Sequence, residues 1–442
     1  MLSARRSLEL ALVTTFALAS CTEPTNPPVM SDPSVLNARP GTTTDPTVTS
    51  TVPSASPRGT TLDVQINGSG FDNGSQATMP LHGVLDSRVH VNSTRYVKST
   101  QVVANVTITG DAVIDAYDVV VVTAAGKKGI GTEAFVVQLQ AEVMAGGYHV
   151  NAVNQNGDAV GDVTNPVSTC NGPLPTFWRA DGTRVTLPLG AFCGGSPLAI
   201  NASGVILGSL SGGVSNSRGL WIPSGGTYTL QVLAPAPDGY RPLTDGALND
   251  NNEIFAWGQG FARLYWWSAA TGWLSVQVPA GATACQALAA INNRGEMAAK
   301  CTVNGVDNPY YWSSHDAAPI ALPRPAGSAL VWPRDINDDG VIVGTGLRWR
   351  PTPSGYVYDV FPVGSPSAIA PDGTMAGSVP GSGSSGGSPA IFYSPTSYQV
   401  LALTNGGRWG SAGSIALTAG GIVVGGTEAN SKALRWKFPT SP

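Results

Sequence analysis

The stretch AINNRGEMA, from Ala290 to Ala298, decides the fold, because close variants of it recur along the chain beyond residue 150. In each copy a small and a branched apolar residue precede a turn, and further apolar residues follow it. Asn-x-x-Gly is what a type I turn prefers at its first and fourth positions, and glycine at the fourth position allows a positive φ. We therefore expect a tight hairpin at each copy. The copies align on one glycine column: Gly157, Gly204, Asn252, Gly295, Gly340, Gly373 and Gly421.

An asparagine column lies three residues before the glycine column. Asn252 replaces glycine in the third copy, and asparagine is the non-glycine residue that tolerates positive φ best. This replacement indicates that the backbone conformation is the requirement. The asparagine column comprises Asn154, Asn201, Asn249, Asn292 and Asn337, with Ala370 and Thr418 in the last two copies.

An aromatic residue and then a more variable strand follow each hairpin. Four strands per repeat at a period of about 45 residues are typical of a β-propeller blade. Seven turns predict seven blades, and six is the alternative because the interval from Gly340 to Gly373 is short. The chain ends soon after the last aromatic, so we expect a strand near Leu139 to Met144 to complete the last blade and close the ring. We expect burial of the aromatics between blades, with sugar stacking as the alternative; they are Trp178, Trp221, Trp267, Trp312, Trp349, Tyr393 and Trp436.

This region, residues 139–442, resembles the bacterial extracellular propeller-like repeats called HAF repeats, through the pattern AIN..G.I.G followed by LW. The composition agrees with an all-β protein. Gly (54) and Pro (34) are abundant, and both disfavour helices. The net charge of -4 does not suggest a nucleic-acid surface, which would need a clustered basic face.

Residues 45–138 show short alternating apolar runs that predict a small β-sandwich. Leu62, Val64 and Ile66 alternate with polar residues, and Tyr117 to Val122 reads as a buried strand. The segment resembles the immunoglobulin-like IPT/TIG domain, in VQINGSGF, VKSTQVVANV, AYDVVVV and the closing FVV. Such domains serve as spacers and binding modules, so the fold by itself assigns no function.

The N-terminus has the pattern of a targeting segment, residues 1–20. Arg5 and Arg6 precede the apolar stretch Leu10 to Leu18, which ends in LASC. The ending resembles the bacterial lipoprotein lipobox, which implies a lipidated Cys21 and a membrane anchor; the alternative is an ordinary secretory peptide. Thr22 favours the outer membrane of the cell envelope. Residues 21–44, rich in Pro and Thr, are expected to form a disordered tether.

Four further cysteines permit three pairings, and an even number in an exported chain suggests disulfides. The hairpin model places Cys285 and Cys301 opposite each other across the turn at Asn292. Cys170 and Cys193 then remain as the second pair.

The sequence gives little support for a catalytic or metal-binding motif. The four His residues form no HExxH, and the G-x-S-x-G match at 383–387 lies in a low-complexity loop. Turn chemistry explains the acidic stretches at 249–253 and 337–339, so neither a metal nor a cofactor is expected.

Three loops that enter the inner strands bring an aromatic beside an arginine to one face. They are expected to bind an anionic glycan or a peptide carboxylate; the alternative is that the aromatics cover the core edge and the arginines are solvated. We expect a non-catalytic binding or adhesion protein with a glycan or a surface protein as ligand, and hence no enzyme. The alternatives are a carbohydrate-active lyase or hydrolase, or a structural subunit of an envelope complex. The candidate ligand residues are Tyr240, Arg241, Trp332, Arg334, Arg408 and Trp409.

Overall fold

The computed structural model describes most of the chain beyond residue 44. Every regular element in these ranges is a β-strand, which confirms the all-β prediction. None of the described residues belongs to a helix that could cross a membrane. The described ranges are 45–139, 141–166, 172–212, 217–236, 238, 242–258, 262–286, 290–327, 331–381, 387–404, 410–428 and 432–439.

Two four-stranded sheets form the first part of the described chain, and their apolar faces share one core. Alternate residues of the strand from Gln101 to Ile108 are fully buried, as the period-2 pattern predicts. One sheet has the order β1 (Thr47–Val52), β3 (Thr60–Ser69), β6 (Gln101–Ile108), β5 (Val89–Lys98). The other has the order β2 (Ala55–Pro57), β8 (Lys128–Gln138), β7 (Ala116–Val122), β4 (Gln76–Thr78).

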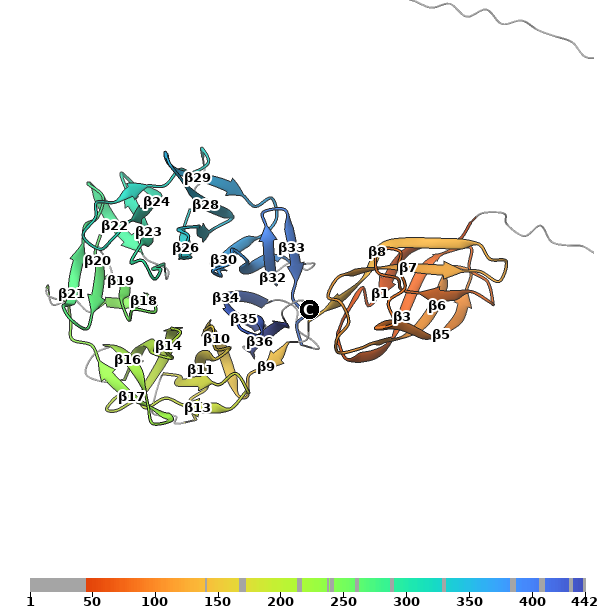
Figure 1. The fold of residues 1–442 in the computed structure, drawn as a ribbon, viewed down its shortest axis with the longest axis horizontal. Helices are drawn as coiled ribbons and strands as arrows, with labels where there is room; N and C mark the ends of the chain where they lie inside the picture. Colours follow the sequence, from red (N-terminus) through yellow and green to blue (C-terminus); the bar gives the residue numbers. More distant parts are fainter. Residues whose placement is uncertain are drawn as a thin grey trace, which may run out of the picture. The chain divides into compact units, whose positions relative to one another are not determined.

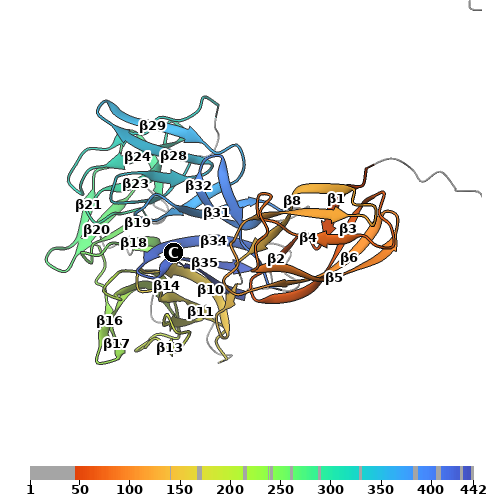
Figure 2. The same cartoon turned by 45° about the vertical axis from the view of Figure 1, so that its right-hand side comes forward.

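Seven further four-stranded sheets, counted over the described residues, follow one another around a ring (Figure 1). In Figure 1 the first strands of most of these sheets lie on the inner side of the ring, and Figure 2 shows the same ring turned by 45°. We number them ring sheets 1 to 7. Sheets 1 to 4 are β10 (Gly147–Val153), β11 (Ala159–Val163), β12 (Leu174–Trp178), β13 (Arg184–Thr186); β14 (Gly194–Ile200), β15 (Ile206–Ser211), β16 (Ser217–Ser224), β17 (Thr227–Val232); β18 (Pro242–Leu248), β19 (Ile254–Gly258), β20 (Leu264–Ser268), β21 (Gly272–Val276); β22 (Ala282–Gln286), β23 (Met297–Val303), β24 (Val306–Trp312), β25 (Ile320–Ala321).

Ring sheets 5 to 7 continue in the same way, and the arrangement fits a β-propeller. They are β26 (Pro333–Ile336), β27 (Ile342–Gly344), β28 (Leu347–Thr352), β29 (Gly355–Val360); β30 (Ser365–Ile369), β31 (Met375–Pro380), β32 (Gly387–Ser394), β33 (Ser397–Val400); β34 (Gly410–Thr418), β35 (Gly421–Glu428), β36 (Lys432–Pro439), β9 (Glu142–Val143).

The hairpin between the first two strands of each ring sheet has the expected turn. The N–H of Gly295 donates to the carbonyl of Asn292 at 3.0 Å, and Gly295 has a φ of 75°. Asn252, the one non-glycine in this column, has a φ of 61°. The requirement for a left-handed residue therefore explains the repeated glycine.

The turn asparagines also link neighbouring ring sheets, which the turn preference alone does not predict. The Oδ1 of Asn292 accepts the N–H groups of Arg294 and Glu296 within its own turn. Its Nδ2 donates to the carbonyl of Asn337 in the next sheet at 2.9 Å. The same link joins Asn154 to Asn201, Asn201 to Asn249, Asn249 to Asn292 and Asn337 to Ala370. We call this series the asparagine belt.

Replacing Asn292 by alanine should destabilise the ring by about 2 kcal/mol, because it leaves buried backbone donors and a carbonyl without partners. Chemical denaturation monitored by tryptophan fluorescence measures the loss. The control is Asn251→Ala, an exposed amide in the neighbouring turn that bonds one carbonyl, for which we expect a change within about 0.5 kcal/mol. Equal losses in the two variants would contradict the role of the belt.

The aromatic column is buried between sheets, as expected, with one exception. Trp312 is fully buried, and its Nε1 donates to the carbonyl of Gln277, just after the outer strand of the preceding sheet. Trp221, Trp349 and Trp436 donate in the same way to Pro188, Pro323 and Ala402. The prediction for the sixth position of the column was wrong: Tyr393 is 49% exposed, and Phe392 beside it is fully buried. Strand alternation directs adjacent side chains to opposite faces, so an error of one residue reverses the assignment.

The ring closes through a strand from before its first sheet, as expected for residues 139–144. β9 pairs with β36, with Val143 opposite Leu434 and Glu142 opposite Arg435. Arg435 is fully buried, and its guanidinium holds Glu142 through bonds of 2.9 and 2.8 Å. It also donates to the carbonyl of Gly157 in ring sheet 1 at 2.8 Å. One buried cation thus joins the first and last sheets.

The predicted bond between Cys285 and Cys301 is confirmed. The two residues are paired across β22 and β23, with their Cα atoms 4.1 Å apart. Cys193 is also disulfide-bonded. Cys170 lies outside the described residues, so its pairing stays a prediction.

Candidate functional site

The innermost strands of the ring carry bulges at similar places. In β10, β14, β26, β30 and β34 the pairing with the second strand shifts by one residue near the middle of the strand. A bulge leaves one residue unpaired and re-aims its side chain. The residues at the shifts are Asn151, Leu198, Arg334, Ser367 and Gly413, and all of them line one cavity.

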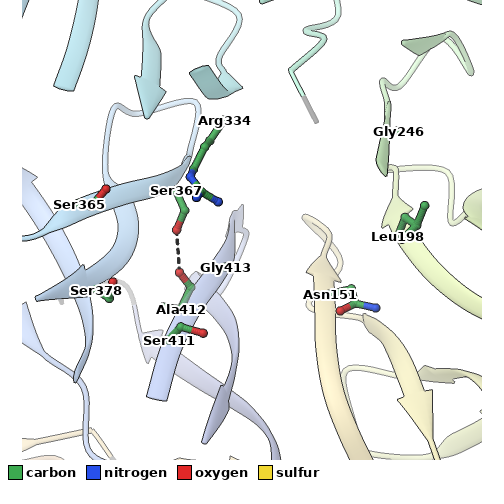
Figure 3. Close-up of a pocket in the computed structure, with 10 residues that line it drawn as sticks. All are labelled: Asn151, Leu198, Gly246, Arg334, Ser365, Ser367, Ser378, Ser411, Ala412 and Gly413. Atoms are coloured by element: carbon green, nitrogen blue, oxygen red, sulfur yellow. Dashed lines mark hydrogen bonds between the residues drawn. The ribbon is translucent and has the colours of Figure 1, made fainter. Parts of the chain in front are cut away.

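This cavity, which we call the channel cavity, has a volume of about 610 Å³ and is lined by the first strands of several ring sheets (Figure 3). Figure 3 shows Arg334 on the side of Ser367 and Ser411, with Asn151 and Leu198 across the cavity. Among the described residues that line the cavity, Arg334 is the one that carries a charge. A cavity of this size and position is a common place for a small-molecule site.

The polar side chains at the bulges differ in their partners. Asn151 donates to the carbonyl of Pro197 in the next sheet at 2.7 Å, and Ser367 donates to the carbonyl of Ala412 in its next sheet at 3.0 Å. Arg334 is exposed to the cavity, and its guanidinium bonds no other side chain or carbonyl in the described part of the chain. A guanidinium without a protein partner in a cavity is well suited to bind a carboxylate, sulfate or phosphate.

A histidine paired with a buried carboxylate lies two residues before Asn151 on the same strand. Nδ1 of His149 is 3.3 Å from Oδ1 of Asp162, whose side chain is 8% exposed. The hydroxyl of Ser196, from β14 of the next sheet, donates to Oδ2 of Asp162 at 2.8 Å. Asn151 in turn approaches Ser196, with its Nδ2 3.3 Å from that hydroxyl. This series connects the histidine to the lining of the channel cavity.

The pairing sets the tautomer of the histidine. An ionised Asp162 only accepts hydrogen bonds, so it favours the form of His149 with the proton on Nδ1. In this tautomer Nε2 is the nitrogen without a proton, on a side chain that is 40% exposed. A histidine oriented in this way by a carboxylate is a common arrangement for general acid–base chemistry.

A second ionisable group of the channel is Asp335, beside Arg334 on β26. Its oxygens accept the N–H groups of Ile336 and Ile369 at 2.9 and 2.8 Å. Burial raises the pKa of Asp335 to about 7, and the two backbone hydrogen bonds only partly oppose this. Asp335 lines a second hollow of about 240 Å³, at the end of the first strands where the turns lie.

Only part of the predicted ligand site falls in the described chain. Arg334 lies in the channel cavity, whereas Trp332 is half-buried with Lys300 Nζ 4.2 Å from its ring centre. Trp332 thus packs on a lysine of the neighbouring sheet. Tyr240, Arg241, Arg408 and Trp409 lie outside the described residues, and so does most of the G-x-S-x-G stretch.

The lining of the channel cavity has a sequence signal that the prediction did not use. It is the residue three positions before the asparagine or alanine that starts the turn. In ring sheets 1, 2, 3, 5 and 6 this residue is Asn151, Leu198, Gly246, Arg334 and Ser367, and all five line the cavity.

No known family model matches the chain, and no curated protein matches it either. Solved structures are similar to it at low sequence identity. Virginiamycin B lyase from Staphylococcus aureus has 12% identity and a TM-score of 0.46, over 68% of this chain and 99% of the lyase. A gluconolactonase from Xanthomonas campestris has 11% identity and a TM-score of 0.37, over 68% and 91%. The β-propeller domain of Cps50 (Swd1) from Myceliophteria thermophila has 11% identity and a TM-score of 0.30, over 73% and 90%.

The comparison corrects one expectation from the sequence. We expected a protein that is not an enzyme, yet the first two of these similar structures are enzymes, a lyase and a lactonase. The sequence expectation relied on the absence of linear catalytic motifs. A propeller site is assembled from several sheets, so such motifs do not report on it.

Proposed function

We propose that the protein is a lyase or hydrolase that acts on an anionic carbohydrate in the channel cavity. The observation that carries the proposal is the guanidinium of Arg334, which faces the cavity and bonds no other group in the part of the chain that the structure describes. Its planar fork binds carboxylates and sulfates with two parallel hydrogen bonds. Such an arginine, in a cavity that serine residues also line, therefore supports an anionic substrate that is rich in hydroxyl groups.

His149 and Asp162 supply the acid–base chemistry in this proposal. In a lyase, Nε2 of His149 takes a proton from a carbon next to a carboxylate of the substrate, a C=C bond forms as the C–O bond to the leaving sugar breaks, and water gives a proton to the leaving oxygen. In a hydrolase, the same nitrogen takes a proton from the water that attacks the glycosidic carbon, the C–O bond to the leaving sugar breaks, and the leaving oxygen is protonated by water. In both reactions Asp162 holds the imidazole in place and stabilises the imidazolium that forms.

We further propose the finer architecture on which this function rests. The ring is a seven-bladed propeller of HAF-type repeats over residues 139–442, and the sandwich of residues 45–138 is an IPT/TIG-type immunoglobulin-like domain. Cys21 carries the lipid of a bacterial lipoprotein, and residues 21–44 tether the protein to the cell envelope at the outer membrane. The seven four-stranded sheets and the LASC sequence support these proposals.

The test is turnover of anionic polysaccharides by the mature chain. Polygalacturonate, alginate and hyaluronan are compared with neutral dextran, with detection of new reducing ends and of the ultraviolet absorbance of unsaturated products. Arg334→Ser introduces a serine, the residue type that ring sheet 6 carries at the equivalent bulge as Ser367. It should raise KM about tenfold or more. The matched control is Arg350→Ser, an arginine paired with Asp359 on β28 and β29. If no anionic polymer is turned over, or if Arg334→Ser leaves turnover unchanged, the proposal fails.

A further inference from the structure

The first strand of ring sheet 5 departs from its equivalents at two successive positions. Asp335 stands two residues before the turn, where every other ring sheet has alanine: Ala152, Ala199, Ala247, Ala290, Ala368 and Ala416. Arg334, one residue earlier, is the one charged residue of its own column. A carboxyl group in a column of mostly buried alanines costs stability, since it must be desolvated. Residues that cost stability in this way occur mainly at functional sites.

Asp335 has no cationic partner among the described residues. Its hydrogen bonds come from two backbone N–H groups, and the other charged side chains that line its hollow are Asp250 and Asp338. Asp250 accepts the N–H of Ala202, and Asp338 accepts the N–H of Asn293. The described residues that line this hollow include no lysine or arginine. The charge of an ionised Asp335 is therefore left for a ligand to balance.

Arg334 does not neutralise the carboxylate of Asp335. It lines the channel cavity, whereas Asp335 lines the hollow at the turn end, and no ion pair joins them. Burial raises the pKa of Asp335 and the two backbone hydrogen bonds lower it, and Arg334 is not among the groups that shift it. Because residues of the same first strands line both spaces, the two charges follow one another along the channel.

We propose that the channel binds a substrate that carries both an anionic group and an ammonium group, with Arg334 facing the anion and Asp335 facing the ammonium. This rests on the proposed function and deepens it, because it assigns the class of substrate that would occupy the channel cavity and the hollow at the turn end together. The arginine forms a bidentate pair with the anion. The ammonium donates to the carboxylate of Asp335, whose two backbone bonds leave further lone pairs free.

The test measures binding without turnover, by titration calorimetry on the mature chain. The probes are ω-amino acids of increasing length, from 4-aminobutyrate to 6-aminohexanoate, with hexanoate and hexylammonium as singly charged controls. We expect at least one amino acid to bind about tenfold more tightly than either control at pH 8. The advantage over hexanoate should shrink at pH 5.5, where Asp335 is protonated, because the pKa of Asp335 is about 7.

Two variants test which residue binds the ammonium group and which binds the anionic group. Asp335→Ala restores the residue of the six equivalent sheets, so it should fold with an unchanged or higher Tm. It should remove the advantage of the amino acid over hexanoate, while Arg334→Ser should remove its advantage over hexylammonium. The inference is overturned if hexanoate binds as tightly as every amino acid, if no amino acid binds, or if Asp335→Ala leaves the ratio unchanged. Selective amino-acid binding without turnover of any polysaccharide would instead overturn only the enzymatic proposal.

Discussion

Replacing Glu142 by alanine should destabilise the ring by about 3 kcal/mol, because it leaves the fully buried guanidinium of Arg435 without its carboxylate. The lost interaction is the one that fixes β9 to β36 and closes the ring. Arg435 keeps its bonds to carbonyl groups of ring sheet 1, which limits the loss. Equilibrium denaturation monitored by tryptophan fluorescence measures the change.

The control is Lys437→Ala, which removes the exposed partner of the same carboxylate, 3.2 Å away. It should cost less than about 1 kcal/mol.

The pH dependence of stability gives a second test. Burial acts to raise the pKa of Glu142, but the hydrogen bonds and charges of Arg435 and Lys437 together outweigh it and lower the pKa. The stabilisation is therefore present above the ordinary value of 4.5 and is lost as the pH falls through the lower folded value. Equal stability of the wild type and Glu142→Ala at pH 7 would refute this account of closure.

Replacing His149 by alanine should lower kcat by about 10²- to 10⁴-fold on any substrate found in the turnover test, because it removes the proposed general base. Binding through Arg334 should be nearly unchanged, since the two residues lie on ring sheets 1 and 5. Steady-state kinetics gives kcat, and calorimetry with the unreactive probes gives the affinity.

Two further variants separate a catalytic role from a structural one. Asp162→Asn keeps the shape but no longer favours the Nδ1–H tautomer, so kcat should also fall. Ser196→Ala removes the hydrogen bond to Asp162 and the 3.3 Å contact with Asn151 Nδ2 but keeps the imidazole and its carboxylate, so its effect on kcat should be much smaller. If His149→Ala retains wild-type kcat, another group provides the acid–base chemistry.

The sequence predicts most of the ring because its turns depend on local chemistry. A position that needs positive φ restricts the residue to glycine or asparagine, so the column from Gly157 to Gly421 is visible without coordinates. The pairing of Cys285 with Cys301 follows from the same hairpin. Phe392 was missed because neighbouring aromatics on a strand differ only in the face that they occupy.

Most of the candidate site could not be predicted, because it depends on pairing between strands that lie apart in the chain. The bulge at Arg334 is defined by the partners of its neighbours on β27. The contacts of Asp162 come from two different sheets, through His149 and Ser196. Asp335 is different: it stands out in the sequence as the one acid in a column of alanines.

A crystal structure of the mature chain with a bound anionic oligosaccharide tests most directly whether the channel is the functional site. We predict that the ligand lies in the channel cavity, with its carboxylate or sulfate within hydrogen-bond distance of the guanidinium of Arg334. An ordered oligosaccharide bound only to the sandwich, or only to the outer strands of the ring, would contradict this prediction.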